Sequence, residues 1–492
     1  MNVQGLEIQT SVGRLLGQAS GQGVVAWKGI PYAAPPVGPL RWRPPQPAPR
    51  WSGLRPALDF GPDFPQAPNP ALRSAAMSED CLYLNVWAPA GAEPGSLPVM
   101  VWLHGGGFVA GSGADARSDG ERLAREGAVV VSFNYRSGVF GFLAHPSLSQ
   151  ESGQAISGNY GLMDQIAALR WVREHIRAFG GDPQRVTAFG VSAGSASIAL
   201  MLLIPQAAGL FDRAVLHSPG TGRPLATLAE AEALGASVEA DLDRLRGLSA
   251  EEVFRLTSRL NPAVRGLTTP RILRPIRDGV LIPEDERPAF VAGRLHRMPL
   301  IVGTNADEGT LLTKTWPVAD IAASRALLAA NFPRAVDEAW RHYGCSEDAL
   351  AHAGIAKAFA DTQFNLGARL LTRAMAAQGQ PVWRYRFTRC RPGRQDGPHH
   401  GDEVSYVFGN LEVGRGVEPE PFNGDDEAVS LAMRRAWVRF ARDAAPGDVG
   451  GLEWAPVSAT INDPFEFGDR FGPGPDPHTE ALDFLDRYFS DA

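Results

Sequence analysis

The sequence predicts an α/β protein in which helices flank both faces of a mostly parallel central sheet. Five short apolar runs are typical of buried parallel strands: 99–103, 129–133, 186–189, 214–216 and 300–302. Between these runs, apolar residues recur at helical spacing over 162–176, and small residues from 193 onward favour a second helix. Strands that alternate with helices along a chain assemble into parallel sheets.

The remaining chain is predicted to extend this core rather than to form further domains. Helical stretches rich in alanine and leucine lie at about 220–275 and 315–380, and no linker composition surrounds them. We therefore expect one domain over residues 1–492 that carries these two stretches as cap insertions. Prolines between 31 and 70 are interleaved with aromatic residues, which predicts an ordered surface wrap.

Charge argues against several classes of partner. The formal net charge is −7, which is unfavourable for binding to nucleic acid or to an anionic membrane. Trp383, Tyr385 and Phe387 alternate with arginines, as they would in a groove for single-stranded nucleic acid. The strict alternation instead indicates a half-buried strand with the aromatic side chains on one face.

The three cysteines and the N-terminus bear on the compartment. Cys81, Cys345 and Cys390 lie far apart, which excludes a disulfide framework and a cysteine-rich zinc site. The first residues lack the basic start and apolar run of a signal peptide, and the longest apolar stretches are too short to span a bilayer. We expect a cytoplasmic protein without membrane contact, as a monomer or a weak homo-oligomer.

The segment Gly190-Val-Ser-Ala-Gly194 carries the clearest chemical signal. An apolar strand precedes it and a helical run follows it, which is the strand–turn–helix context of a nucleophilic serine. Glycines on both sides remove Cβ atoms that would clash in so tight a turn. We favour Ser192 as a nucleophile over a plain glycine-rich turn.

A glycine-rich loop, His104-Gly-Gly-Gly-Phe108, directly follows the strand at 99–103. An acyl-transfer intermediate develops an oxyanion, which needs backbone N–H donors that already point at it. Successive glycines allow the backbone to approach that oxygen closely. With the N–H of the residue after the serine, the loop predicts an oxyanion hole, and a flexible glycine loop is the alternative.

The acid and the base have two candidates each. Asp307 and Glu308 are adjacent, directly after the strand at 300–302, and spacing does not choose between them. His399 and His400 are also adjacent, and a solvated pair of loop histidines is the alternative to a catalytic base. The chain has no H-E-x-x-H, Walker lysine or G-x-G-x-x-G, so we predict no metal and no nucleotide cofactor.

Five stretches together resemble the type-B carboxylesterase family, which includes bacterial para-nitrobenzyl esterases and the cholinesterases. In chain order they are 28–42 (KGIPYAAPPVGPLRW), 79–89 (EDCLYLNVWAP), 104–108 (HGGGF), 179–194 (FGGDP to GVSAG), and 303–309 with 400–409. The resemblance spans nearly the whole chain and implies an α/β-hydrolase fold. It also implies residue roles: nucleophile Ser192, acid Glu308, base His400, oxyanion donors Gly106, Gly107 and Ala193, and a supporting Ser218.

Two positions depart from the family pattern. Val191 stands where members usually carry a glutamate before the nucleophile, which makes a preference for cationic substrates doubtful. Phe64 stands where secreted members place a cysteine that pairs with the equivalent of Cys81. Cys81 is therefore expected to be a free buried thiol, in keeping with a reducing compartment.

The resemblance implies a serine carboxylesterase that hydrolyses small-molecule esters through an acyl-enzyme, without a cofactor. The expected substrates are short- to medium-chain esters or esters with aryl or bulky groups. Two alternatives remain open. One is a catalytically inactive adhesion or scaffold protein of the same superfamily, and the other is a hydrolase of amides, carbamates or lactones on the same fold.

Overall fold

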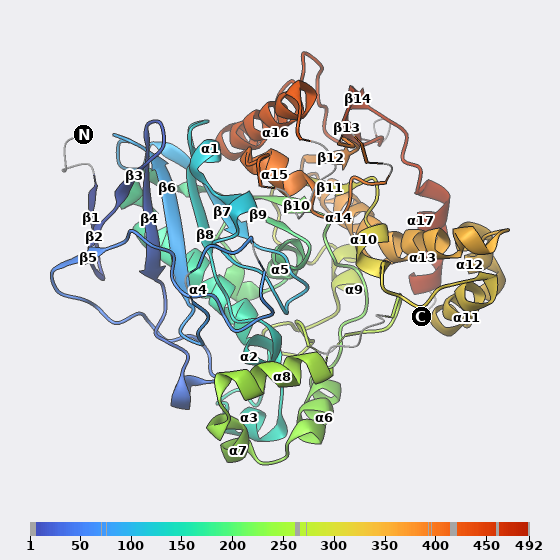
Figure 1. The fold of residues 1–492 in the computed structure, drawn as a ribbon, viewed down its shortest axis with the longest axis horizontal. Coiled ribbons are helices and arrows are strands. Elements are labelled where there is room, and N and C mark those ends of the chain that lie inside the picture. The colour runs from blue at the N-terminus through green and yellow to red at the C-terminus, as the bar shows by residue number, and fades with distance from the viewer. Residues whose placement is uncertain are drawn as a thin grey trace.

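An 11-stranded sheet forms the centre of the computed structural model (Figure 1). The structure describes residues 6–69, 71–74, 76–260, 266–271, 273–391, 393–394, 396–413, 421–458 and 462–490. The strand order is β14-β13-β12-β11-β10-β9-β7-β8-β6-β4-β3. The strands from β8 to β13 pair in parallel, and those at both ends of the sheet pair antiparallel.

All five predicted strands belong to the parallel part of this sheet. The strands of the sheet are β3 (Gln18–Ser20), β4 (Val24–Pro31), β6 (Tyr83–Pro89), β7 (Leu97–Leu103), β8 (Val129–Phe133), β9 (Gly181–Val191), β10 (Arg213–His217), β11 (Leu300–Asn305), β12 (Val382–Phe387), β13 (Phe465–Phe467) and β14 (Phe471–Pro473). A separate three-stranded sheet consists of β1 (Glu7–Thr10), β2 (Gly13–Leu16) and β5 (Leu54–Pro56).

Helices cover both faces of the large sheet because its strands are apolar on both sides. In β7, Val99 and Val101 pack in the cluster on one face, whereas Met100 and Trp102 pack in the cluster on the other. The first face is covered mainly by α4 (Tyr160–His175), α5 (Ala193–Met201), α9 (Glu286–Val291) and α14 (Leu366–Ala377). The second face is covered by α1 (Glu121–Ala124), α15 (Glu403–Phe408) and α16 (Gly424–Asp443). This arrangement confirms the predicted α/β architecture.

The two stretches expected as caps are helical and stand mostly away from the sheet (Figure 1). The first contains α6 (Leu228–Val238), α7 (Leu242–Gly247) and α8 (Ala250–Leu260), which lie near α2 (Gly138–Phe142) and α3 (Pro146–Glu151). The second contains α11 (Ile321–Asn331), α12 (Val336–Tyr343) and α13 (Ala351–Ala360), which share an apolar cluster with α17 (Thr479–Ser490). The short α10 (Thr310–Thr313) precedes them.

The second stretch ends in one continuous helix with a wide turn in its middle. A π-helical segment, Asp361–Asn365, joins α13 to α14 without interruption. α14 differs from the other helices of this stretch because Leu371 and Met375 pack in the cluster that lines the sheet. The π-helical segment therefore connects a helix outside the sheet to a helix on it. Such segments are frequent at functional sites.

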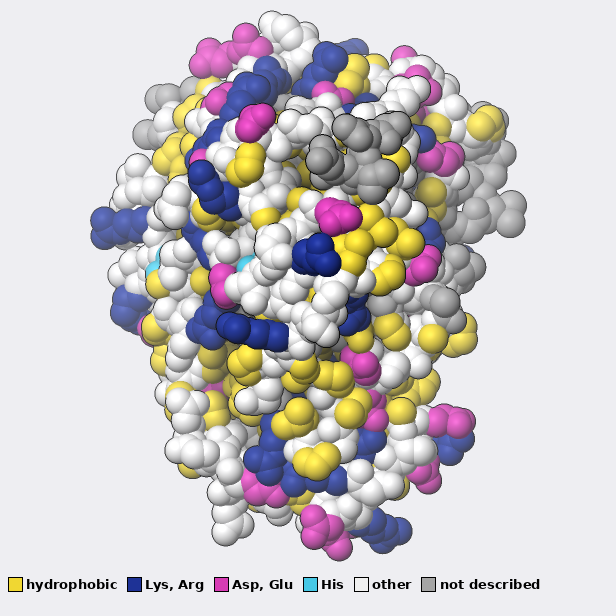
Figure 2. All heavy atoms as spheres, turned by 90° about the vertical axis from the view of Figure 1, so that its left-hand side faces the viewer, with side chains coloured by type: hydrophobic (Ala, Val, Ile, Leu, Met, Phe, Trp, Pro, Cys, Tyr) yellow, Lys and Arg dark blue, Asp and Glu magenta, His cyan; other side chains and the backbone are white. Residues whose placement is uncertain are grey.

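The N-terminal part is ordered, as the interleaved aromatic residues predict. Within the proline-rich stretch, the side chains of Tyr32, Trp42 and Phe64 are buried. Figure 2 shows the face of the molecule that the N-terminal strands form, where basic, acidic and apolar side chains are interspersed. In the described part of the chain, no helix is both long and apolar enough to cross a bilayer.

Strand β12 confirms the interpretation of its alternating sequence. Trp383, Tyr385 and Phe387 are buried in one apolar cluster. Arg384 and Arg386 point the other way and form ion pairs with Asp476 and Glu466.

Candidate active site

Ser192 lies on a strained turn between β9 and α5. Its backbone has φ 57° and ψ −117°, outside the regions that a non-glycine residue ordinarily adopts, and such strain costs of order 1–3 kcal/mol. The Ser192 N–H donates to the carbonyl of His217 at 3.0 Å, which ties the turn to the end of β10. A Cβ at Gly194 would overlap the carbonyl of Leu103 at the end of β7, so only glycine allows this close packing.

The glycine loop after β7 folds back on itself beside Ser192. Gly106 has φ 116°, and a Cβ there would overlap the carbonyl of Ala110. The carbonyl of Gly106 accepts the N–H groups of Val109 and Ala110 at 3.1 and 3.0 Å. Gly106, Gly107 and Ala193 line the same pocket as Ser192.

His104, the first residue of this loop, has a buried and uncharged side chain. Its ring stacks on Tyr135 with centroids 4.2 Å apart, and the Tyr135 hydroxyl donates to the His104 carbonyl at 2.8 Å. Burial lowers the pKa of His104 to about 4, so the imidazole is uncharged near neutral pH. His104 thus fixes the start of the glycine loop without adding charge to the pocket.

Glu308 and His400 are brought together from remote parts of the chain. A parallel bridge joins Asp307 to His399, with the Asp307 N–H donating to the Pro398 carbonyl at 3.0 Å. As a result, Glu308 Oε2 lies 2.5 Å from His400 Nδ1. The other oxygen of the buried Glu308 carboxylate accepts the Ser218 hydroxyl at 2.5 Å and the Asn305 N–H at 2.6 Å.

The neighbouring members of each candidate pair point elsewhere. Asp307 Oδ1 accepts the N–H groups of Gly309 and Thr310 at 3.3 and 3.0 Å, which makes it a local turn residue. His399 Nε2 lies 3.6 Å from Asp307 Oδ2 and 3.2 Å from Asp396 Oδ2. His400, by contrast, lines the pocket that Ser192 also lines. The geometry therefore favours Glu308 and His400 over their neighbours.

Phe364, which no sequence motif marks, packs against the His400 ring. The two rings stack with centroids 4.2 Å apart and an interplanar angle of 23°. Phe364 belongs to the π-helical segment, and Gln363 beside it also lines the pocket. In the sequence Phe364 is one apolar residue among many in a helical stretch, so no pattern marks it.

A second buried polar group supports the ends of β10 and β11. The Trp437 indole donates to His217 Nε2 at 3.1 Å, and His217 Nδ1 lies 2.7 Å from the Tyr385 hydroxyl. Burial lowers the pKa of His217 to about 3, so this ring stays neutral. The Asn305 amide donates to the buried Glu403 at 2.5 Å. These contacts support the strand ends that are followed by Ser218 and Glu308, the two side chains beside His400.

The pocket encloses 280 Å³ above the carboxyl ends of β7, β9 and β10. Its apolar lining includes Val191, Phe108, Leu312 and Phe359. Four arginines also line it, and the sequence analysis singled out none of them: Arg117, Arg223, Arg271 and Arg274.

Glu286, at the start of α9, is buried, interacts electrostatically with Arg223 and Arg274, and gives the fold a pH dependence. Burial raises the pKa of Glu286 to about 7, against the opposing effects of Thr221, of the Gly222 N–H, and of Arg274 and Arg223. The native state then keeps a proton that the unfolded chain releases near pH 4.5, the ordinary pKa of a glutamate. Stability is therefore lost as pH rises from about 4.5 to about 7.

We expect Glu286→Gln to remove this pH dependence, since the amide oxygen still accepts the Gly222 N–H that now lies 3.1 Å from Glu286 Oε2. Between pH 5 and 8, the free energy of unfolding of the unmodified protein should fall by roughly 2–3 kcal/mol more than that of the variant. Urea titrations of both proteins at the two pH values measure this difference. Parallel pH profiles for the two proteins would rule out the assignment.

Solved structures with the same fold have related sequences. A structure of PNB esterase superposes with a TM-score of 0.86 at 33% identity, and the match covers 98% of this chain and 99% of that one. A carboxylesterase from Geobacillus stearothermophilus gives a TM-score of 0.85 at 35% identity, covering 97% and 99%. The fold is that of the α/β-hydrolases, as the sequence predicts.

Proteins with similar sequences identify the family within the α/β-hydrolases. The profile of the carboxylesterase family matches residues 4–469. Fumonisin B1 esterase of Sphingopyxis macrogoltabida is 43% identical over 464 residues, which are 92% of this chain and 84% of that protein. Para-nitrobenzyl esterase of Bacillus subtilis is 35% identical, with coverage of 89% and 90%. The chain belongs to the carboxylesterase family and is a carboxylic ester hydrolase. An inactive adhesion or scaffold protein is not favoured.

Proposed function

We propose that Ser192, His400 and Glu308 carry out ester hydrolysis in two acyl-transfer steps. The observation that carries the proposal is that Ser192 and His400 line one pocket while Glu308 contacts His400 from outside the lining. Ser192 stands on a strained turn at its edge, His400 lines it, and Glu308 lies 2.5 Å from His400 Nδ1. This is the order and the relation of groups that a serine hydrolase uses.

In the first step Ser192 Oγ attacks the ester carbonyl while His400 accepts its proton. Glu308 accepts the Nδ1–H of His400, which leaves Nε2 as the basic nitrogen and stabilises the imidazolium that forms. His400 then returns the proton to the leaving alcohol, and an acyl-Ser192 ester remains. In the second step a water molecule gives its proton to His400 and attacks the acyl-enzyme, which releases the carboxylic acid.

The N–H groups of Gly106, Gly107 and Ala193 are proposed to stabilise the oxyanion in both steps. Their support is the tight glycine turn beside Ser192 and the start of α5 at Ala193, where helix N–H groups point outward. One such donor contributes about 10²–10³ in rate. Ser218 is proposed to keep Glu308 oriented through its 2.5 Å hydrogen bond.

The caps, the compartment and the assembly complete the proposal. The helices at about 220–275 and 315–380 are proposed to roof the pocket as caps, and Arg271 and Phe364 from these stretches line it. Cys81 is a free buried thiol in the same apolar cluster as Phe64, which supports a cytoplasmic location. The proposed assembly is a monomer or a weak homo-oligomer.

Trapping of the acyl-enzyme tests the proposed nucleophile. Rapid mixing with para-nitrophenyl butyrate should release a burst of about one para-nitrophenol per active site when deacylation is slow. Treatment with diethyl para-nitrophenyl phosphate should abolish activity and place one diethyl phosphate on Ser192. Fragment mass spectra must distinguish Ser192 from Ser195 and Ser197, which lie on the same helix. A label on any other residue would contradict the assignment.

The relatives suggest first substrates. Fumonisin B1 and para-nitrobenzyl esters are proposed for screening because proteins named for them are 43% and 35% identical to this chain. Short- to medium-chain and aryl esters complete the panel.

A further inference from the structure

Basic side chains are concentrated around the proposed nucleophile of an otherwise acidic protein. The whole chain has a net charge of −7, yet among the described residues that line the pocket the aspartates, glutamates, lysines and arginines are Asp115 and four arginines. A buried concavity of one sign focuses the electrostatic field and attracts ligands of the opposite sign. The distribution within this pocket therefore bears on substrate choice.

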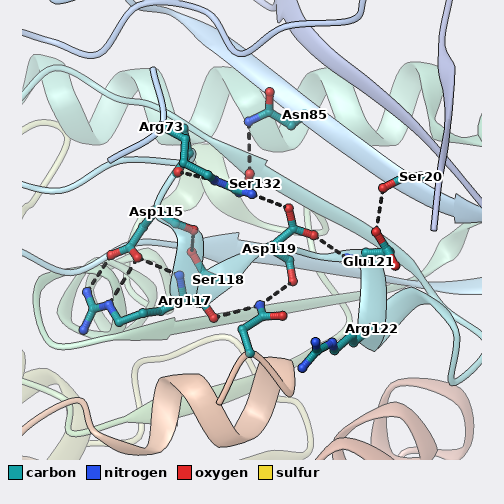
Figure 3. Close-up of polar contacts among 12 residues, drawn as sticks. Ser20, Arg73, Asn85, Asp115, Arg117, Ser118, Asp119, Glu121, Arg122 and Ser132 are labelled. Carbon is teal, nitrogen blue, oxygen red and sulfur yellow. Dashed lines mark hydrogen bonds and ion pairs between the residues drawn. The ribbon is translucent and has the colours of Figure 1, made fainter. Parts of the chain in front are cut away.

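One of the four arginines is balanced locally. Arg117 Nη2 lies 2.5 Å from Asp115 Oδ2, and Arg117 Nε lies 3.1 Å from Asp115 Oδ1, so the two side chains form a bidentate pair (Figure 3). This pair sits on the η3 turn (Ala116–Ser118), away from the segments that carry the other three arginines. The other three arginines that line the pocket are Arg223, Arg271 and Arg274.

Arg274 spans two parts of the proposed catalytic machinery. Its Nη2 donates to the Gly220 carbonyl at 3.3 Å, just beyond the segment that carries Ser218. Its guanidinium also lies over the Phe108 ring, 5.3 Å from the centroid, at the end of the glycine loop. Contact with an aromatic face keeps a guanidinium planar and oriented. Arg274 is thus held between the two loops that border the reacting centre.

Arg271 and Arg223 approach the same space. Arg271 Nη2 donates to Gln363 Oε1, and Gln363 precedes the phenylalanine that stacks on His400. Arg223 is only 6% exposed and follows β10 by a short loop. Glu286 interacts electrostatically with Arg223 and Arg274 and is not among the residues that line the pocket. Among the described lining residues, basic side chains outnumber acidic ones.

We infer that the pocket accepts esters that carry a free carboxylate, which binds to Arg223, Arg271 and Arg274 while the ester carbonyl lies at Ser192. Guanidinium groups bind carboxylates through paired, charge-assisted hydrogen bonds. The residue before the nucleophile is apolar Val191, which lines the pocket and adds no negative charge beside the anion. The inference rests on the proposed function, because it places the carboxylate relative to Ser192.

The anion can reside on either side of the ester bond, and matched substrates distinguish the two. Mono-para-nitrophenyl glutarate carries the carboxylate on the acyl side, and para-nitrophenyl butyrate is its neutral counterpart. 3-Carboxyphenyl butyrate carries it on the alcohol side, with phenyl butyrate as counterpart. For at least one pair, kcat/KM should be about tenfold or more higher for the anion, chiefly through a lower KM.

Variants at the arginines test the assignment to these side chains. Arg223→Gln, Arg271→Gln and Arg274→Gln should each reduce the anionic-to-neutral ratio of kcat/KM by about fivefold or more. Arg255→Gln is the matched control, since Arg255 lies on the exposed side of α8 and pairs with Glu251. Its ratio should stay unchanged. Circular dichroism shows whether each variant folds.

Inhibition by a free dicarboxylate tests carboxylate binding on the unmodified protein. Glutarate should inhibit hydrolysis of para-nitrophenyl butyrate competitively, and 0.5 M NaCl should weaken that inhibition, whereas glutaramide should not compete. If the enzyme hydrolyses neutral esters but shows neither anion preference nor glutarate inhibition, the inference is wrong and the esterase stands. If it hydrolyses no ester and gives no burst, the proposed function fails.

Discussion

Replacement of Ser192 by alanine is expected to lower kcat for para-nitrophenyl butyrate by about 10⁴–10⁶-fold, with KM nearly unchanged. The hydroxyl forms the acyl bond, and neither water nor another side chain on the same turn takes its place. Alanine keeps the Cβ in the strained backbone conformation, so the fold should remain. Steady-state kinetics and thermal unfolding of the variant measure the two effects.

Ser197→Ala is the matched control for that variant. Ser197 lies on the same helix and donates to the Ala193 carbonyl at 3.0 Å, which is an ordinary internal contact. Its loss should change kcat by no more than a few fold. Hydrolysis by Ser192→Ala at the level of this control would refute the nucleophile.

The second large effect is expected at Glu308. Glu308→Gln should lower kcat by about 10³–10⁴-fold, because an amide neither stabilises the imidazolium nor fixes the productive tautomer of His400. The size of the side chain is kept, and its oxygen still accepts the Ser218 hydroxyl and the Asn305 N–H. Kinetics from pH 6 to 9 with para-nitrophenyl butyrate show whether activity recovers at high pH.

Asp307→Asn separates this effect from general damage to the loop. Asp307 Oδ1 accepts two backbone N–H groups, and the amide oxygen of asparagine can do the same. We expect activity within a few fold of the unmodified protein. A larger loss at Asp307 than at Glu308 would mean that the wrong carboxylate has been assigned.

The parallel core was predictable because its strands are buried on both faces and are therefore continuous apolar runs. The boundaries of individual strands were harder to predict from the sequence. β9 begins at Gly181, five positions before the predicted start. Gly181 pairs with Leu97 of β7, and an irregularity in register separates this pair from the pair of Val186 and Val99. Residues 182–185 are polar or proline and do not follow a strand pattern. They lie in the irregularity itself, between the pairs Leu97–Gly181 and Val99–Val186.

The sequence pattern does not decide between the adjacent candidates for the acid and for the base. Adjacent residues point to different sides of an extended chain, so one of Asp307 and Glu308 must face the pocket. The choice depends on the bridge between Asp307 and His399, which joins positions 92 residues apart. The family resemblance pointed to Glu308 and His400, and the structure places these two side chains 2.5 Å apart. The sequence did not predict that the arginines and Phe364 would lie at the pocket. Their positions depend on how the cap segments pack in the tertiary structure, which no local pattern shows.

The continuous helix of α13 and α14 has a consequence for how such a pocket changes over evolution. Its π-helical segment holds one residue more than a regular turn, and each residue of an α-helix rotates the chain by about 100°. Loss of a single residue there would turn Phe364 away from His400 and Gln363 away from the pocket, while α14 kept its place on the sheet. The apolar cluster of α11–α13 and α17 would have to reposition as a unit. Deletion of one residue in this segment would therefore change both the contact that orients His400 and the packing of the helices outside the sheet.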